Sequence, residues 1–192
     1  MASGKLQGVR VAILVSDGFE KLELLDPRWT LDHAGAAMFV IAPSKDRVTG
    51  WNLGREEKPV PVDIPLKSAK AQDFHALLLP CGRTSATRLS HNDDAVEFVR
   101  DFVRAGKPVA AIGEGVGILL QAGVLRGRRV TLGLLSEEDL KNADAIYTNE
   151  NLVRDGNLIT ARRLDDVSAF ILEMTQLLAD LRQHAGNMRK TA

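Results

Sequence analysis

The sequence predicts an α/β fold, a three-layer sandwich in which helices cover both faces of a mostly parallel central sheet. Short runs of β-branched and apolar residues alternate along the chain with longer segments whose apolar residues recur at helical spacing. The connections are short and contain glycine or proline, as in parallel strands joined by right-handed crossover helices. Because no interdomain linker or internal repeat interrupts this order, we expect residues 1–192 to form a single domain.

The strands are predicted from short apolar runs that end in turn residues. The buried parallel strands are expected at residues 9–15, 37–42, 75–79 and 109–112. Residues 151–153 and 157–160 flank Arg154-Asp155-Gly156, which is typical of a hairpin turn. Between residues 43 and 65 the chain is rich in proline, and we expect Val48 and residues 60–64 to form a hairpin flap there.

The helices are predicted from apolar spacing and from residues that start or stop a helix. We expect the first helix to begin with Asp26 as its N-cap and Pro27 in its first turn, and to stop at Gly35. Later helices are expected at residues 92–105, 116–122, 136–142 and 165–181. The polar residues 183–192 are expected to form a flexible tail.

Composition excludes several classes of function. Lys+Arg and Asp+Glu both number 25, so the formal net charge is zero, which argues against binding to nucleic acid or to an anionic membrane surface. One cysteine and four scattered histidines provide neither a disulfide framework nor metal-ligand spacing, and we expect no metal or cofactor. Because no apolar run suits a membrane span or a signal peptide, a cytoplasmic location is expected.

A ligand crevice is expected beyond the carboxyl ends of the parallel strands, where sheets of this class bind their ligands. The chain segments that reach this edge are residues 16–23, 80–84, 113–117 and 131–136. These segments contain the candidate site residues. Trp29 and Trp51 lie outside them and are expected in packing or oligomer contacts.

Sequence motifs across most of the chain resemble those of the ThiJ/PfpI superfamily. The matching stretches include Asp17-Gly-Phe-Glu-Lys-Leu-Glu23, Leu77-Leu-Leu-Pro80, Ala105-Gly-Lys-Pro-Val-Ala-Ala-Ile112, Ala122-Gly-Val-Leu-Arg-Gly-Arg-Arg-Val-Thr131 and Asp155-Gly-Asn-Leu-Ile-Thr160. The resemblance implies a flavodoxin-like, class I glutamine amidotransferase-like fold. It also implies a cysteine nucleophile in an Ala-Ile-Cys-His-Gly-Pro elbow, assisted by a glutamate from the loop after the first strand. The activities attributed to this family are peptide or amide hydrolysis, glyoxalase-type conversion and deglycation.

This sequence departs from the family pattern at the elbow. Gly113 stands where the cysteine belongs, Glu114 where the histidine belongs, and Val116 where the proline belongs. The glutamate side of the site is retained as Glu20 and Glu23. Because a glycine has no side chain, covalent thiol chemistry cannot occur at residue 113. Glycine does, however, adopt at little cost the sparsely populated backbone conformation that such an elbow needs.

Other residues of the predicted crevice leave alternatives open. Cys81 is either a relocated nucleophile or a small filler residue, and nearby carboxylates would disfavour the thiolate that a nucleophile needs. Glu114 is either solvated at a helix start or part of a carboxylate cluster. The glycines that could contact a ligand in this crevice are Gly82, Gly115 and Gly133. The crevice is either open or filled by Leu132, Leu134 and Leu135.

Three hypotheses for function follow. The first is a non-catalytic or repurposed binding protein, related to stress, that holds a small molecule in the degenerate crevice. The second is a hydrolase or a glyoxalase/deglycase-like enzyme that uses Cys81 or the Glu20 and Glu23 carboxylates. The third is a structural or partner-binding domain with an occluded crevice. In each case we expect a homodimer or a higher homo-oligomer.

Overall fold

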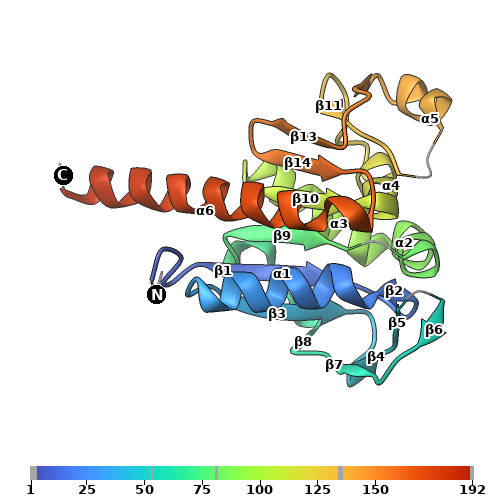
Figure 1. The fold of residues 1–192 in the computed structure, drawn as a ribbon, viewed down its shortest axis with the longest axis horizontal. Coiled ribbons are helices and arrows are strands. Elements are labelled where there is room, and N and C mark those ends of the chain that lie inside the picture. The colour runs from blue at the N-terminus through green and yellow to red at the C-terminus, as the bar shows by residue number, and fades with distance from the viewer. Residues whose placement is uncertain (1–3, 53, 81, 134–135, 191–192) are drawn as a thin grey trace.

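A seven-stranded sheet forms the centre of the protein in a computed structural model that describes residues 4–52, 54–80, 82–133 and 136–190, with side chains up to residue 183 (Figure 1). All neighbouring strands are parallel except the antiparallel pair at one edge. In spatial order the strands are β13 (Leu152–Asp155), β14 (Leu158–Ala161), β10 (Val109–Ile112), β9 (Ala76–Leu79), β1 (Arg10–Leu14), β3 (Ala37–Ala42) and β8 (Ile64–Pro65). The strands predicted from the four apolar runs are confirmed as β1, β3, β9 and β10.

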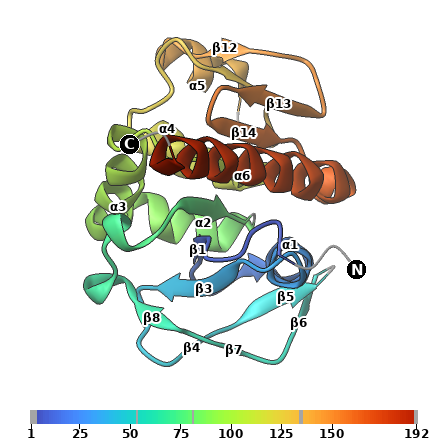
Figure 2. The same cartoon turned by 90° about the vertical axis from the view of Figure 1, so that its left-hand side faces the viewer.

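Helices cover both faces of this sheet, as predicted (Figures 1 and 2). Helices α1 (Lys21–His33) and α6 (Val167–Lys190) lie on one face. Helices α2 (Arg83–Ser90), α3 (Asp93–Arg104) and α4 (Val116–Gln121) lie on the other. Alternation along β1 produces the two cores: Val11 and Ile13 belong to one apolar cluster, and Ala12 and Leu14 belong to the second.

The first helix starts earlier than predicted. Helix α1 begins at Lys21 after Glu20, so that Pro27 lies inside the helix instead of in its first turn. Pro27 lacks the N–H that would bond to the carbonyl four residues back, which costs stability. Burial offsets this cost, because Leu24 and Leu31 on either side of the proline are both fully buried in the core. The predicted stop is confirmed at Gly35, which has a φ of +100°.

Several elements differ from the prediction or are added to it. The residues Arg154 and Asp155 belong to β13 instead of the turn, and α6 continues to Lys190, beyond the predicted end at residue 181. Helix α2 was not predicted, nor was the parallel pair β11 (Arg129–Val130) and β12 (Ile146–Tyr147). The predicted helix near residue 140 is α5 (Glu137–Asn142), and Ser136 caps it by accepting a hydrogen bond from the Asp139 N–H at 3.1 Å.

The segment between β3 and β9 contains short ladders and two single turns of 3-10 helix. Antiparallel pairs form between β4 (Arg47–Val48) and β7 (Val60–Pro61) and between β5 (Gly50–Asn52) and β6 (Arg55–Glu56). Strand β2 (Phe19–Glu20) pairs in parallel with β5. The 3-10 turns are η1 (Leu66–Ser68) and η2 (Ala71–Asp73), and two others, η3 (Gly113–Gly115) and η4 (Leu164–Asp166), occur later. Pairing with β5 therefore joins this segment to the backbone of Glu20.

None of the helices in the described part of the chain combines the length and the apolar character needed to cross a membrane.

Candidate functional site

A cavity of about 580 Å³ lies at the carboxyl ends of the parallel strands, where the sequence predicted a crevice. Its walls come from the segments that follow β1, β9, β10, β11 and β14. The residues that line it are Glu20, Glu23, Gly82, Arg83, Gly113, Glu114, Gly133, Arg162, Arg163 and Leu164. We call this cavity the elbow pocket.

The elbow itself is a sharp change from strand to helix at Gly113. Strand β10 ends at Ile112, and Gly113 then adopts a φ of +55°, a left-handed conformation that favours glycine. Gly133 lies directly against this turn, since a Cβ atom added at Gly133 would stand 2.8 Å from the Gly113 Cα atom. Two glycines thus allow two backbone segments to approach each other closely at the floor of the pocket.

The other candidate glycines have different roles. Gly82 lines the pocket with a φ of +125°, and a Cβ atom there would stand 2.5 Å from the Phe19 Cα atom. Gly115 does not line the pocket; a Cβ atom there would collide with the Leu79 carbonyl oxygen. Gly115 is therefore needed for the packing of α4 on the end of β9, and the expectation that it contacts a ligand is not supported by the geometry.

Glu23 is a buried carboxyl group of the site with a raised pKa. It projects from α1 and is only 2% exposed. Burial, together with the smaller effect of the negative charges of Glu114 and Glu20, raises its pKa to about 8. At neutral pH the Glu23 carboxyl is therefore mostly protonated, so that it can donate a hydrogen bond as well as accept one.

Sequence reasoning missed two arginines of the pocket, Arg162 and Arg163. Arg162 and Arg163 follow β14, and Leu164 completes that wall. The Arg162 guanidinium donates to the Asn149 side-chain oxygen at 2.7 Å, which holds it at the rim. The signal that could have found these residues is the parallel pairing of β14 with β10, which brings the carboxyl ends of both strands to the same edge.

Some predicted site residues lie outside the described residues, namely Cys81, Leu134 and Leu135. Leu132 is 6% exposed and belongs to the apolar cluster beneath α3 and α4, not to the pocket lining. Within the described ranges, no group of three or more His, Cys, Asp and Glu side chains is arranged to hold a metal ion.

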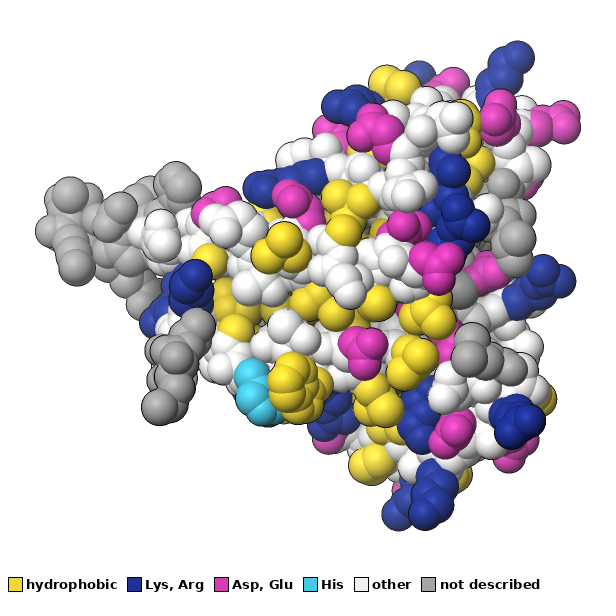
Figure 3. All heavy atoms as spheres, viewed as in Figure 1, with side chains coloured by type: hydrophobic (Ala, Val, Ile, Leu, Met, Phe, Trp, Pro, Cys, Tyr) yellow, Lys and Arg dark blue, Asp and Glu magenta, His cyan; other side chains and the backbone are white. Residues whose placement is uncertain are grey.

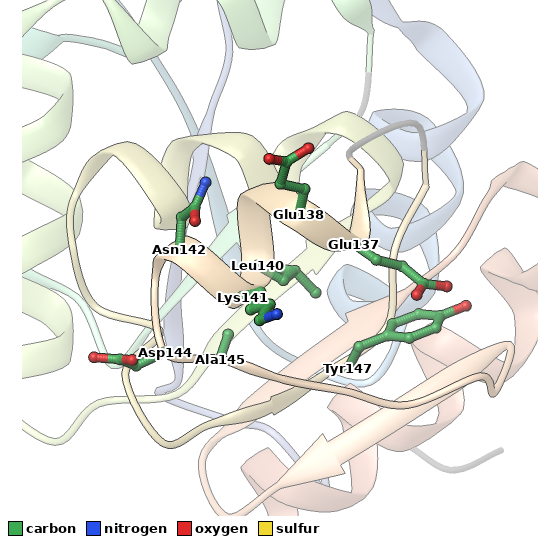
Figure 4. Close-up of a pocket in the computed structure, with 8 residues that line it drawn as sticks. All are labelled: Glu137, Glu138, Leu140, Lys141, Asn142, Asp144, Ala145 and Tyr147. Atoms are coloured by element: carbon green, nitrogen blue, oxygen red, sulfur yellow. The ribbon is translucent and has the colours of Figure 1, made fainter.

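A larger cavity of about 740 Å³ lies away from the sheet edge, between α5 and the segment that leads into β12 (Figure 4). Tyr147 and Glu137 approach each other on one side of it, whereas Glu138 and Asp144 point away from each other. The carboxyl groups that line it, those of Glu137, Glu138 and Asp144, are exposed, whereas Glu23 in the elbow pocket is buried and has a raised pKa. We therefore place the candidate site at the elbow pocket, despite its smaller volume.

Comparison with known proteins confirms the resemblance. The sequence profile of the DJ-1/PfpI family matches residues 9–177. This chain belongs to the DJ-1/PfpI family. The mixed α/β architecture with its large, mostly parallel sheet is the flavodoxin-like, class I glutamine amidotransferase-like fold of this family.

Relatives within the DJ-1/PfpI family include proteins named as deglycases. One from Thermococcus kodakarensis is 36% identical over 171 residues, which cover 88% of this chain and 99% of that protein. The protein/nucleic acid deglycase 2 of Escherichia coli is 36% identical over 170 residues, which cover 88% of this chain and 97% of that protein. Among solved structures, an Anabaena variabilis protein with DJ-1/ThiJ/PfpI-like and ferritin-like domains has a TM-score of 0.80 and 32% identity, covering 90% of this chain and 48% of that one.

Proposed function

We propose that this protein is a DJ-1/PfpI member without the thiol chemistry of the family, and that it binds a small polar molecule in the elbow pocket. The observation that carries the proposal is the combination of Gly113 at the left-handed elbow with an open cavity of about 580 Å³ beside it. A glycine at this position offers no nucleophile, and a volume of this size lies within the range of ligand-binding pockets, roughly 300–1,000 Å³.

The lining of the pocket supports a polar ligand. Carboxyl groups of Glu20, Glu23 and Glu114 and guanidinium groups of Arg83, Arg162 and Arg163 surround the same space. Side chains of both signs allow a ligand to be oriented by several charge-assisted hydrogen bonds. Of the apolar residues that an occluded crevice would require, Leu132 is buried outside the pocket lining, and Leu134 and Leu135 lie outside the described residues.

The absence of thiol chemistry is tested by measuring methylglyoxal consumption and casein hydrolysis by the purified protein. We expect rates no higher than those of the buffer control. The variants Cys81→Ala and Glu20→Gln are measured beside it, with Glu56→Gln as a matched control because Glu56 is exposed on β6 and does not line the pocket. Turnover that disappears in Cys81→Ala would show that a relocated thiol is active and would overturn the proposal.

Binding is tested separately by a thermal-shift screen with small carboxylates, amines, amino acids and sugars. We expect at least one compound to raise the melting temperature of the wild-type protein, because a ligand that binds only the folded state stabilises it. The shift should shrink in Glu114→Gln and persist in Glu56→Gln. If no compound raised the melting temperature, or if Glu114→Gln kept the full shift, binding in the elbow pocket would be refuted.

A second candidate function is acid–base catalysis by the Glu23 carboxyl, which the names of the deglycase relatives also favour. Its specific support is the Glu23 pKa of about 8, since an acid with a pKa near the working pH is an efficient proton donor. This candidate predicts turnover that survives Cys81→Ala, is lost in Glu23→Gln and declines as the pH rises through about 8. Turnover without these features would exclude it.

A further inference from the structure

A second groove adjoins the elbow pocket. It has a volume of about 520 Å³ and runs between helices α2 and α4. The residues that line it are Arg83, Ala86, Thr87, Ser90, Glu114, Gly117, Leu120 and Gln121. Arg83 and Glu114 also line the elbow pocket, so that the two cavities meet at one pair of opposite charges.

Arg83 and Glu114 do not form an ion pair with each other. Arg83 is exposed, and within residues 4–52, 54–80, 82–133 and 136–190 it forms no ion pair with any carboxylate, Glu114 included. A guanidinium group binds a carboxylate through two parallel N–H···O bonds, and a carboxylate accepts hydrogen bonds from an ammonium group. A ligand that passes from one cavity to the other and carries both charges can therefore contact both residues, with its anionic group at Arg83 and its ammonium group at Glu114.

Among the described residues that line the rest of the groove, none has a charged side chain. Thr87, Ser90 and Gln121 supply hydroxyl and amide groups, and Ala86 and Leu120 supply apolar surface. Such a lining accommodates an uncharged chain with polar atoms, because a charged group there would lose hydration without gaining a partner. The charges lie at the junction, and the neutral surface lies along the groove.

We propose that the ligand is an α-amino acid with a long, uncharged, polar side chain. Its carboxylate pairs with Arg83, its ammonium group enters the elbow pocket beside Glu114, and its side chain lies between α2 and α4. This inference rests on the proposed function, because it names the class of ligand for the same pocket, and it extends the site into a groove that the elbow pocket does not include.

Isothermal titration calorimetry with the wild-type protein tests the ligand class through matched analogues. L-Citrulline carries both charges and an uncharged polar side chain, 5-ureidopentanoate lacks the ammonium group, N-carbamoylputrescine lacks the carboxylate, and L-norleucine lacks the polar end. We expect L-citrulline to bind and each of the three analogues to bind about tenfold or more weakly, a loss typical of one charge-assisted or polar contact. Equal binding of either singly charged analogue would overturn the zwitterion assignment.

Two variants test the placement of the ligand. Arg83→Gln should weaken the binding of L-citrulline about tenfold. Gln121→Leu should also weaken the binding of L-citrulline, but it should leave the binding of L-alanine unchanged, because the side chain of L-alanine is too short to reach Gln121. Arg126→Gln is the matched control, because Arg126 is exposed and lies outside both cavities. Unchanged L-citrulline affinity in Arg83→Gln or Gln121→Leu would overturn the inference.

The outcomes also separate this inference from the proposed function. If the thermal-shift screen finds a ligand whose effect depends on Glu114 while L-citrulline gives no heat at millimolar concentration, the ligand class is wrong and the elbow pocket remains a binding site. If neither experiment detects binding, both the inference and the proposed function are wrong.

Discussion

Glu23 shows how one buried side chain controls the chemistry of the elbow pocket. Among the described residues, three carboxyl groups line this cavity, and the one on α1 has lost most of its contact with water. Burial and the charges of Glu114 and Glu20 act in the same direction, so that the Glu23 proton is held to a pKa of about 8. The pocket thus contains a hydrogen-bond donor at neutral pH where a surface carboxylate would only accept.

This raised pKa predicts a pH-dependent effect of Glu23→Gln on stability. The folded protein keeps the Glu23 proton between pH 4.5 and about 8, whereas the unfolded chain releases it, so the contribution of Glu23 to the free energy of unfolding falls as pH rises through this window. Glutamine has no proton to lose. We therefore expect the free energy of unfolding of Glu23→Gln to rise relative to that of the wild type as the pH rises from 5 to 8. The change should amount to at most about 1.4 kcal/mol per pH unit.

Urea unfolding at pH 5, 6, 7, 8 and 9 measures this difference between the two proteins. Above pH 8 the difference should become constant, since Glu23 is then ionised in both states. Glu56→Gln, an exposed control on β6, should differ from the wild type by the same amount at every pH. A flat difference for Glu23→Gln would mean that the carboxyl is not protonated in the folded protein.

Gly113 carries a second prediction at the residue scale. Its φ of +55° costs a non-glycine residue on the order of 1–3 kcal/mol, so Gly113→Cys should lower the melting temperature. Gly123→Ala is a suitable control, because Gly123 has a φ of +67° and open space around its Cβ position. The loss of stability in Gly123→Ala therefore measures the cost of the left-handed backbone conformation without a steric clash of the side chain. A melting temperature of Gly113→Cys equal to or above that of the wild type would contradict the argument.

The positions of individual site residues could be predicted from the sequence only where a motif places them at the end of a strand. Glu20, Glu23, Gly113 and Glu114 could be placed in one crevice because each follows the end of a parallel strand in a recognised motif. Which of the two glutamates is buried and has the raised pKa could not be predicted, since Glu20 is only half-buried although both lie in the same short motif. Which of two neighbouring carboxyls is buried depends on how α1 packs on the core.

At the scale of elements, the predictions held where burial and periodicity agree and were wrong where they conflict. Strands β1, β3, β9 and β10 are apolar on both faces, so they were recognised from composition alone. Helix α1 was misplaced because Pro27 normally marks a helix start, and tertiary packing of Leu24 and Leu31 overrode that local preference.

Elements with little apolar content escaped prediction. Helix α2 has the sequence Arg-Thr-Ser-Ala-Thr-Arg-Leu-Ser and contributes only Ser85, Ala86 and Leu89 to the buried interior. Part of its position is fixed by a long-range bond, because the Ser16 N–H donates to the Ser85 hydroxyl at 2.9 Å. A contact between residues so far apart in sequence leaves no local pattern. The groove between α2 and α4 therefore could not be predicted from the sequence.

At the scale of the whole molecule, one face exposes several large apolar side chains. Trp29 on α1 is 65% exposed, and Leu172 and Leu181 on α6 are 71% and 44% exposed. Figure 3 shows hydrophobic side chains gathered over these two helices, which lie in front in this view. Large exposed apolar patches of this kind are typical of protein–protein contacts.

We propose that a second copy of the chain covers this face, since a formal net charge of zero imposes no long-range repulsion between copies. Light scattering should then give at least the mass of a dimer for the wild type. Trp29→Glu and Leu172→Glu should each shift the protein toward the monomer, because burying an unpaired carboxylate in an apolar contact is costly. Ile146→Glu is the matched control: Ile146 is 52% exposed but lies on β12, apart from α1 and α6. A monomeric wild type, or dissociation by Ile146→Glu alone, would exclude this face as the contact.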